Sequence, residues 1–568
     1  MGMCGPFCSI KTSMKEKLIL YQVFTRLFGN RNLSRVPNGT VEENGSGKFA
    51  DFTVSVLRNI KNTGITHIWY TGVIRHATQT DYSAYGIPAN HPAVVKGKAG
   101  SPYAITDYYD VDPDLARSVD NRMVEFEQMV ERTHQVGLKV IIDFVPNHVA
   151  RQYHSICHPE GIVGLGDDDD KGQGFSPANN FYYCPGCRFQ PHFDLKAGAD
   201  EPYEECPARA TGNDHFDASP GVNDWYETIK LNYGVDYYAG GVGYFDPVPD
   251  TWKKMLDILR FWAGKKVDGF RCDMAEMVPS AFWAWALKRL KEEYPQLVII
   301  GEVYNPGLYR TYLASGFDYL YDKVGMYDVL RGVTCGSLPA SHVTGAWQSV
   351  DDIRDHMLYF LENHDEQRIA SDFFAGSGEK AVPALAVSLL LRENPFMLYA
   401  GQQYGEKGMD AEGFSGMDGR TTIFDYWSID TLCRAAKGKL KANEKRLADT
   451  YRKLMHIART EVCVADGLLF DLMYANTDPS LFDASSLYTF LRKSGKEMLL
   501  VVVNFSDDEK ACQVRIPAHA FDYLELGEGS FMATELMTSA TLPVNLLRDG
   551  LVPVRVDARG VVVLKLKF

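Results

Sequence analysis

Acidic and imidazole side chains follow four hydrophobic runs of this sequence. The four stretches read VIIDFVPNH, VDGFRCDMAE, LVIIGEVY and YFLENHDEQR, at Val140–His148, Val267–Glu276, Leu297–Tyr304 and Tyr359–Arg368. A buried strand favours Val, Ile, Leu and Phe, so Asp, Glu and His at its end need a reason to be there. One such side chain alone could be a strand-end cap or a structural ion pair. Four stretches of this kind predict the rim of one parallel barrel, where several strand ends converge on one site.

Three carboxylates in these stretches, those of Asp273, Glu302 and Asp365, suit the cleavage of a glycosidic bond. This reaction needs one carboxylate that attacks or stabilises the anomeric carbon and one protonated acid that releases the leaving oxygen. Arg271 lies two residues before Asp273, so both side chains point to one face of a strand and the guanidinium can hold Asp273 ionised as a nucleophile. Glu302 ends an almost wholly apolar strand, and partial desolvation there suits a proton donor.

Eight strand-like segments alternate with helical patterns, which is the order of a (β/α)8 TIM barrel. The predicted barrel strands are Leu18–Phe24, His67–Thr71, Lys139–Phe144, Gly269–Met274, Val298–Val303, Phe317–Tyr321, Leu358–Leu361 and Phe396–Ala400. The predicted helices include Val119–Val136, Thr251–Ala263, Pro279–Tyr294 and Pro383–Arg392. The sequence therefore predicts an α/β fold whose strand ends bring the four stretches together.

Two further regions depart from this alternation. Residues 149–248 are rich in Gly, Pro, Asp, Asn and Tyr, and a structureless loop of that length is uncommon, so we expect a small inserted domain after the third strand. Beyond residues 453–457 the helical patterns end, and strand-like segments predict a C-terminal antiparallel β-sandwich. These segments are Ser486–Leu491, Met498–Phe505, Ala511–Ile516 and Val554–Phe568. The expected domains are a barrel at 14–148 and 249–457, an inserted domain at 149–248, a sandwich at 458–568 and a flexible tail at 1–13.

Composition argues against several classes of protein. A net charge of −14 disfavours nucleic acid as a partner, because that binding needs a basic face. No apolar run approaches the roughly 18–20 residues of a membrane-spanning helix. Residues 1–13 lack the basic start and apolar core of a signal peptide. The odd number of cysteines, 11, favours reduced thiols, and we expect a cytoplasmic protein.

One group of cysteines has a spacing of its own. Cys184-Pro-Gly-Cys187 is a CxxC pair, and Cys157 and Cys206 lie in the same irregular region. Four thiolates with one such pair could bind a structural zinc ion, and a disulfide or unrelated free thiols are the alternatives. Because no second CxxC is present, we expect that these thiols bind no zinc.

The chain resembles the α-amylase family of retaining glycosidases, glycoside hydrolase family 13. DFVPNH, GFRCDMAEM, GEVY and ENHDE match the four family signatures in order, and the long insert and β-rich tail also match. The resemblance implies that Asp273 is the nucleophile, Glu302 the general acid/base and Asp365 the transition-state stabiliser. The substrate-binding residues that it implies are Tyr103, His148, Arg271 and His364.

The resemblance also bears on cofactors and on substrate size. Asn147 matches a common calcium ligand, and the acidic run Asp167–Asp170 offers further oxygens, although four adjacent acids also suit a solvated loop. Calcium is therefore a candidate cofactor, and no organic cofactor is expected. Glu276-Met277 replaces a Lys-His pair that contacts the acceptor sugar in many relatives. Gly100 stands where exo-acting α-glucosidases carry an acid, which favours an endo-acting or oligosaccharide-acting enzyme.

The activity that the resemblance implies is hydrolysis of α-1,4-glucosidic bonds in starch, glycogen or maltooligosaccharides, with retention through a covalent glucosyl-enzyme. An α-glucanotransferase or a glucoside isomerase would use the same site, with a second sugar intercepting the intermediate. A non-catalytic binding subunit is disfavoured because such proteins typically lose the carboxylates that this chain keeps. The sequence leaves the oligomeric state open.

Overall fold

Eight parallel strands close into a barrel in the computed structural model, which describes residues 17–408, 414 and 416–568. In barrel order they are β1 Ile19–Phe24, β16 Phe396–Tyr399, β15 Met357–Phe360, β14 Tyr319–Tyr321, β13 Val298–Gly301, β12 Gly269–Cys272, β5 Lys139–Phe144 and β2 His67–Thr71. All eight predicted strands are present, and no end differs from its prediction by more than two residues. The predicted tail at 1–13 lies outside the described residues.

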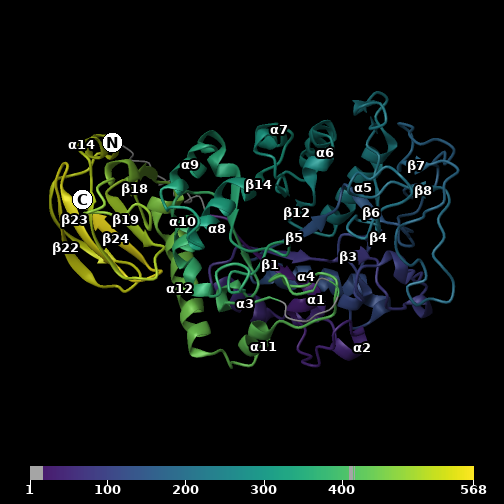
Figure 1. The fold of residues 1–568 in the computed structure, drawn as a ribbon, viewed down its shortest axis with the longest axis horizontal. Coiled ribbons are helices and arrows are strands. Elements are labelled where there is room, and N and C mark those ends of the chain that lie inside the picture. Colours follow the sequence, from purple (N-terminus) through teal and green to yellow (C-terminus); the bar gives the residue numbers. More distant parts are fainter. Residues whose placement is uncertain (1–16, 409–413, 415) are drawn as a thin grey trace, which may run out of the picture.

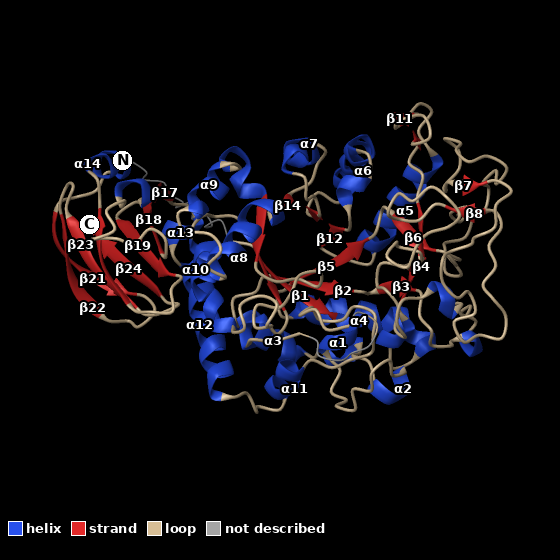
Figure 2. Cartoon of the chain, in the orientation of Figure 1, coloured by secondary structure: helices blue, strands red, loops and turns tan. Residues whose placement is uncertain are grey.

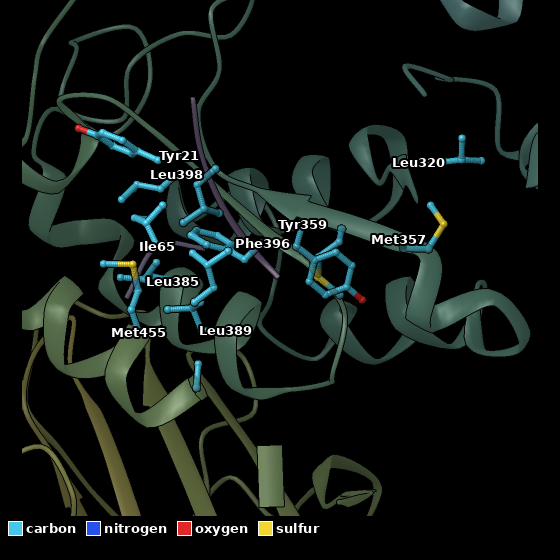
Figure 3. Packing of buried hydrophobic residues seen from close by; sticks show 14 of the residues in the cluster. Tyr21, Ile65, Leu320, Met357, Tyr359, Leu385, Leu389, Phe396, Leu398 and Met455 are labelled. Atoms are coloured by element: carbon cyan, nitrogen blue, oxygen red, sulfur yellow. The ribbon is translucent and has the colours of Figure 1, made fainter. Parts of the chain in front are cut away.

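Helices surround the barrel because each strand buries both of its faces. Leu20, Trp69 and Ile141 belong to a cluster inside the barrel, whereas the residues that alternate with them pack outward. Figure 3 shows part of the outward packing, where Phe396 and Leu398 lie beside side chains of two helices. The surrounding helices are α3 Val54–Asn62, α4 Arg122–Gln135, α5 Asp250–Gly264, α6 Ser280–Glu293, α7 Tyr309–Ala314, α8 Asp328–Thr334, α10 Val382–Leu390 and α12 Ala442–Thr460. The predicted helices correspond to α4, α5, α6 and α10.

The chain between β5 and α5 contains only short, paired strands and loops. The antiparallel pairs are β6 His148–Ala150 with β9 Thr228–Lys230, β7 Tyr183–Cys184 with β8 Ala208–Arg209, and β10 Val235–Asp236 with β11 Val242–Gly243. This inserted segment lies at one end of the molecule in Figure 1. The antiparallel pair β3 Ile74–His76 and β4 Ile105–Val111 lies close to it, because β4 contacts β6. The exact bounds of an inserted domain stay a prediction.

An antiparallel β-structure forms the opposite end of the molecule (Figures 1 and 2). A six-stranded sheet has the order β17-β18-β19-β24-β21-β22, and β20 pairs with β23. The strands are β17 Leu468–Asp471, β18 Leu487–Ser494, β19 Glu497–Asn504, β20 Lys510–Arg515, β21 Gly529–Glu535, β22 Thr541–Leu546, β23 Leu551–Val556 and β24 Val561–Lys567. These antiparallel strands fit the C-terminal sandwich that the sequence predicts.

Two details of this end differ from the prediction. The segment Val554–Phe568 is not one strand, because residues 557–560 form a turn between β23 and β24 with Arg559 at a φ of +50°. Helical structure also continues past residue 457, through the end of α12 to α13 Val462–Ala465 and α14 Ala518–Leu524. Among the described residues, we find no helix with the combined length and apolar character that crossing a membrane requires.

Candidate active site

The ends of neighbouring barrel strands place the three carboxylates. Asp273 and Glu302 directly follow β12 and β13, and each continues its ladder: the Asp273 N–H donates to the Phe144 carbonyl at 2.9 Å and the Glu302 N–H to the Cys272 carbonyl at 3.1 Å. Asp365 lies in the loop after β15. All three line one pocket of about 600 Å³. Tyr103 and His148 line it as well, whereas Arg271, His364 and Asn147 lie behind its wall.

Arg271 links the carboxylates beneath the pocket. Its guanidinium is fully buried and lies 2.7 Å from Asp273 Oδ1, 2.7 Å from Glu302 Oε2 and 3.5 Å from Asp143 Oδ1. The pairing with Asp273 that the sequence predicts is therefore present, but it is one of three. Asp143, on the interior face of β5, was not among the predicted site residues although it stands in the same motif as His148.

One buried cation cannot balance this many acids. Burial raises the pKa of Asp273 well above its usual range, although Arg271 lowers it, and the charge of Glu302 adds to the rise. Burial and the Glu302 charge raise the pKa of Asp365 to about 7. Burial also raises the pKa of Asp143 to about 6. The cluster therefore retains protons near neutral pH and titrates as a coupled unit.

The two histidines are neutral hydrogen-bonding groups. Burial lowers the pKa of His148 to about 3, with the charges of Lys230 and Lys96 acting in the same direction. Burial lowers the pKa of His364 well below its usual range, and the charge of Arg271 contributes. A neutral imidazole has one donor and one acceptor nitrogen, which suits binding to sugar hydroxyls.

Tyr103 lines the pocket and packs on the buried His364 behind it. The Tyr103 hydroxyl lies 2.5 Å from Nε2 of His364, and the two rings stack with centroids 5.2 Å apart. Gln22 on β1 holds the other ring nitrogen at 2.8 Å. The structure thus brings Tyr103, from the loop before β4, against His364 in the loop after β15, and its role in binding substrate stays a prediction.

Several pocket residues were missed by the sequence analysis. They come mostly from loops that carry no recognisable pattern, and include Lys96, Trp225, Tyr304, Lys323, Glu366 and Phe424. The Trp225 ring lies 5.3 Å from the His148 ring, so the inserted segment closes one side of the pocket. Two of the six could have been found, because Tyr304 and Glu366 stand in the GEVY and ENHDE motifs.

The surroundings of Asn147 fit an ammonium group rather than calcium. Nζ of the buried Lys230 lies 2.6 Å from Asn147 Oδ1, 2.6 Å from Asp214 Oδ1 and 3.4 Å from the Met277 carbonyl oxygen. A calcium ion needs six to eight oxygens at about 2.3–2.6 Å, and here it would meet the lysine charge. In the acidic run, the Asp169 carboxylate accepts hydrogen bonds from the backbone N–H groups of Asn180 at 2.7 Å and Phe181 at 3.0 Å, so it holds two segments of the insert together.

The four cysteines of the inserted segment do not form a common ligand set among the described residues. The one close group of metal-ligand types found there joins Cys157 to Asp107 and Asp110. Both carboxylates are already paired with arginines, Asp107 with Arg75 at 3.1 Å and Asp110 with Arg122 at 2.7 Å. The expectation that these thiols bind no zinc stays a prediction.

Comparisons with known proteins agree with this geometry. Residues 22–159 match the family model of the α-amylase catalytic domain. The α-amylase MalA of Haloarcula japonica is 26% identical over 401 residues, which are 69% of this chain and 45% of that protein. α-Amylase 3 of Dictyoglomus thermophilum is 23% identical over 78% of this chain and 77% of its own length. The chain thus spans less than half of one curated relative and about three quarters of the other.

Solved structures share the whole architecture. The α-amylase of Geobacillus thermoleovorans, whose structure is complexed with acarbose, superposes with a TM-score of 0.63 at 17% identity, over 98% of this chain and 100% of that one. At this identity the likeness concerns the fold. The family model over residues 22–159 and the curated relatives support the α-amylase family, and the barrel with its carboxylate-lined pocket is consistent with it.

Proposed function

We propose that this protein hydrolyses α-1,4-glucosidic bonds in starch, glycogen or maltooligosaccharides with retention of the anomeric configuration. The observation that carries the proposal is the single pocket lined by Asp273, Glu302, Asp365 and Tyr103. Curated relatives named α-amylase, neopullulanase and intracellular maltogenic amylase support an α-glucan as the substrate.

The position of Arg271 supports retention rather than inversion. One guanidinium bridges Asp273 and Glu302 at 2.7 Å each, which favours a short separation of the two carboxyl groups. Retaining enzymes have a separation of about 5–5.5 Å, whereas inverting enzymes need about 6.5–9.5 Å to admit a water molecule. Asp273 is therefore the nucleophile that attacks the anomeric carbon, and Glu302 is the acid that protonates the leaving oxygen.

The second half of the reaction uses the same residues. Glu302, now ionised, takes a proton from the incoming water, and the hydroxide oxygen attacks the anomeric carbon to release Asp273. Asp365 and the neutral His148 bind hydroxyl groups of the distorted ring, while His364, whose two ring nitrogens contact Tyr103 and Gln22, holds Tyr103 in place. The first half of the cycle needs one proton on the carboxylate cluster, and the raised pKa values of Asp273 and Asp365 support a proton held there near neutral pH.

Transfer to a second sugar is the alternative outcome of the same chemistry. A cyclomaltodextrin glucanotransferase of Geobacillus stearothermophilus is 22% identical over 86% of this chain. Product analysis on maltoheptaose, soluble starch, pullulan and trehalose tests the proposal. Shorter α-glucans support hydrolysis, chains longer than the substrate indicate transfer, and no change in any substrate contradicts both. Cytoplasmic location stays a prediction.

A further inference from the structure

A tyrosine hydroxyl contacts the expected acid/base directly. Tyr304 lies two residues beyond Glu302 and lines the pocket, and its hydroxyl donates to Glu302 Oε1 at 2.5 Å. The other oxygen of Glu302 is held from below, because Oε2 accepts the Met274 backbone N–H at 2.8 Å and pairs with Arg271. Both oxygens of Glu302 therefore have protein partners: Oε2 contacts groups below the pocket, and Oε1 contacts a residue that lines it.

A second carboxylate fixes the backbone that carries this tyrosine. Glu276 Oε2 accepts the backbone N–H groups of Tyr304 at 3.2 Å and of Asn305 at 3.0 Å. Glu276 belongs to the short helix η6 Ala275–Met277 that follows β12, while Tyr304 follows β13. Glu276, which stands where many relatives carry part of a Lys-His pair, thus holds the loop that follows Glu302. Burial raises the pKa of Tyr304 well above its usual range, and the charge of Glu302 adds to it, so the phenol remains a donor.

We propose that Tyr304 is a positioning residue for the acid/base Glu302 and that Glu276 holds Tyr304 in place; this rests on the proposed function. In the first half of the reaction, the proton of Glu302 passes to the glycosidic oxygen, the bond from that oxygen to the anomeric carbon breaks, and Asp273 bonds to the carbon. Negative charge then develops on Glu302. A hydroxyl donated to an ionised carboxylate binds more strongly than one donated to a neutral acid, so the Tyr304 contact favours this proton transfer.

A pair of substrates separates this role from a structural one. Maltoheptaose needs a protonated leaving group, whereas fluoride leaves α-maltotriosyl fluoride with little protonation. We expect Tyr304→Phe to lower kcat/KM by about tenfold or more on maltoheptaose and by less than about threefold on the fluoride, since general-acid catalysis contributes about 10²–10⁴-fold in total. kcat/KM is the quantity to compare because it reports the step in which the leaving group departs.

Two further variants complete the test. Tyr309→Phe is the matched control, since it removes a nearby phenol hydroxyl that has no hydrogen-bond partner among the described residues, and it should leave the ratio of the two kcat/KM values unchanged. Glu276→Ala should lower kcat/KM selectively on maltoheptaose, as Tyr304→Phe does. Glu276→Gln keeps an acceptor oxygen and should return the ratio of the two kcat/KM values to that of the wild type. Equal losses on both substrates, or no loss on either, would overturn the inference. A wild-type protein inactive on both substrates would instead overturn the proposed function.

Discussion

At the scale of single residues, the site is a problem of charge balance. Arg271 contacts three carboxylates, and Asp365 adds a fourth acid without a contact to the guanidinium. Like charges at such short range cannot all be ionised in a buried site. The raised pKa values of Asp273 and Asp365 mean that the carboxylates share charge and protons as a group, and the proposed reaction needs both a proton and an ionised carboxylate in this group.

Replacement of the nucleophile tests this arrangement. Asp273→Asn keeps the shape and an acceptor oxygen but removes the attacking carboxylate, so we expect kcat on maltoheptaose to fall by about three or more decades. Proton NMR of the wild-type reaction should show the α-anomer first. Near-normal turnover by the variant, or an initial β-anomer, would contradict the assigned roles.

Asp322 allows a test of burial that does not involve the catalytic groups. It precedes the π-helix Lys323–Tyr327, and its Oδ1 accepts the Met326 N–H at 2.9 Å while Oδ2 has no hydrogen-bond partner among the described residues. Burial raises its pKa to about 6. The folded protein therefore binds this proton more tightly than the unfolded chain, and this contribution to stability is lost as the pH rises from about 4 through 6.

We expect Asp322→Asn to become more stable relative to wild type with rising pH. The amide keeps the acceptor for Met326 and does not titrate. Between pH 4 and pH 8 the difference in free energy of unfolding should shift in favour of the variant by on the order of 2 kcal/mol. Urea unfolding at both pH values measures it, and a difference that is independent of pH would show that Asp322 is ionised in the folded protein.

At the scale of elements, a lysine of the inserted segment joins that segment to the loops after two neighbouring barrel strands, β5 and β12. Lys230 lies on β9, Asn147 follows β5, Asp214 belongs to the inserted segment and Met277 follows β12. We infer that the ammonium supplies the positive charge that calcium would bring here. Activity should therefore persist after dialysis against EDTA, and loss of activity that calcium restores would refute this.

Removal of the Lys230 charge should destabilise the contact between the inserted segment and the barrel. Lys230→Met leaves the oxygens of Asn147 and Asp214 without their donor, and we expect a loss of about 1–3 kcal/mol in the free energy of unfolding. Lys265→Met is the matched control, because its pair with Glu127 lies at the surface and should contribute less than about 1 kcal/mol. Equal effects of both variants in urea unfolding would argue against a special role for Lys230.

The elements also show what the sequence could and could not predict. The barrel strands were predictable because each is a short, largely apolar run between helical patterns. The break between β23 and β24 was missed, because Val554–Phe568 is apolar on both sides of a short turn. The inserted segment has strands of only two or three residues, too short for any periodicity, so Trp225 and Lys230 could not be placed in the site from sequence.

At the scale of the whole molecule, the cysteines of the inserted segment raise the question of whether the protein contains zinc. Cys184 and Cys187 lie in one turn, with the Cys187 N–H donating to the Cys184 carbonyl at 3.0 Å, while Cys157 lies beside Arg122. We expect elemental analysis of protein prepared in metal-free buffer to show far less than one zinc per chain. Stoichiometric zinc that resists chelators and disappears in Cys184→Ser would contradict this.

Closure of the barrel has a consequence for how the protein acquires activity. The pairing of β1 with β16 aligns Ile19 with Phe396, so the first and last strands meet only after almost four hundred residues have been made. Contacts of such large sequence separation form slowly, because the entropy of a long loop is lost before they stabilise the chain. Phe424, which completes the pocket wall, comes later still. During synthesis, this protein therefore carries an unfinished catalytic centre until most of its length has left the ribosome.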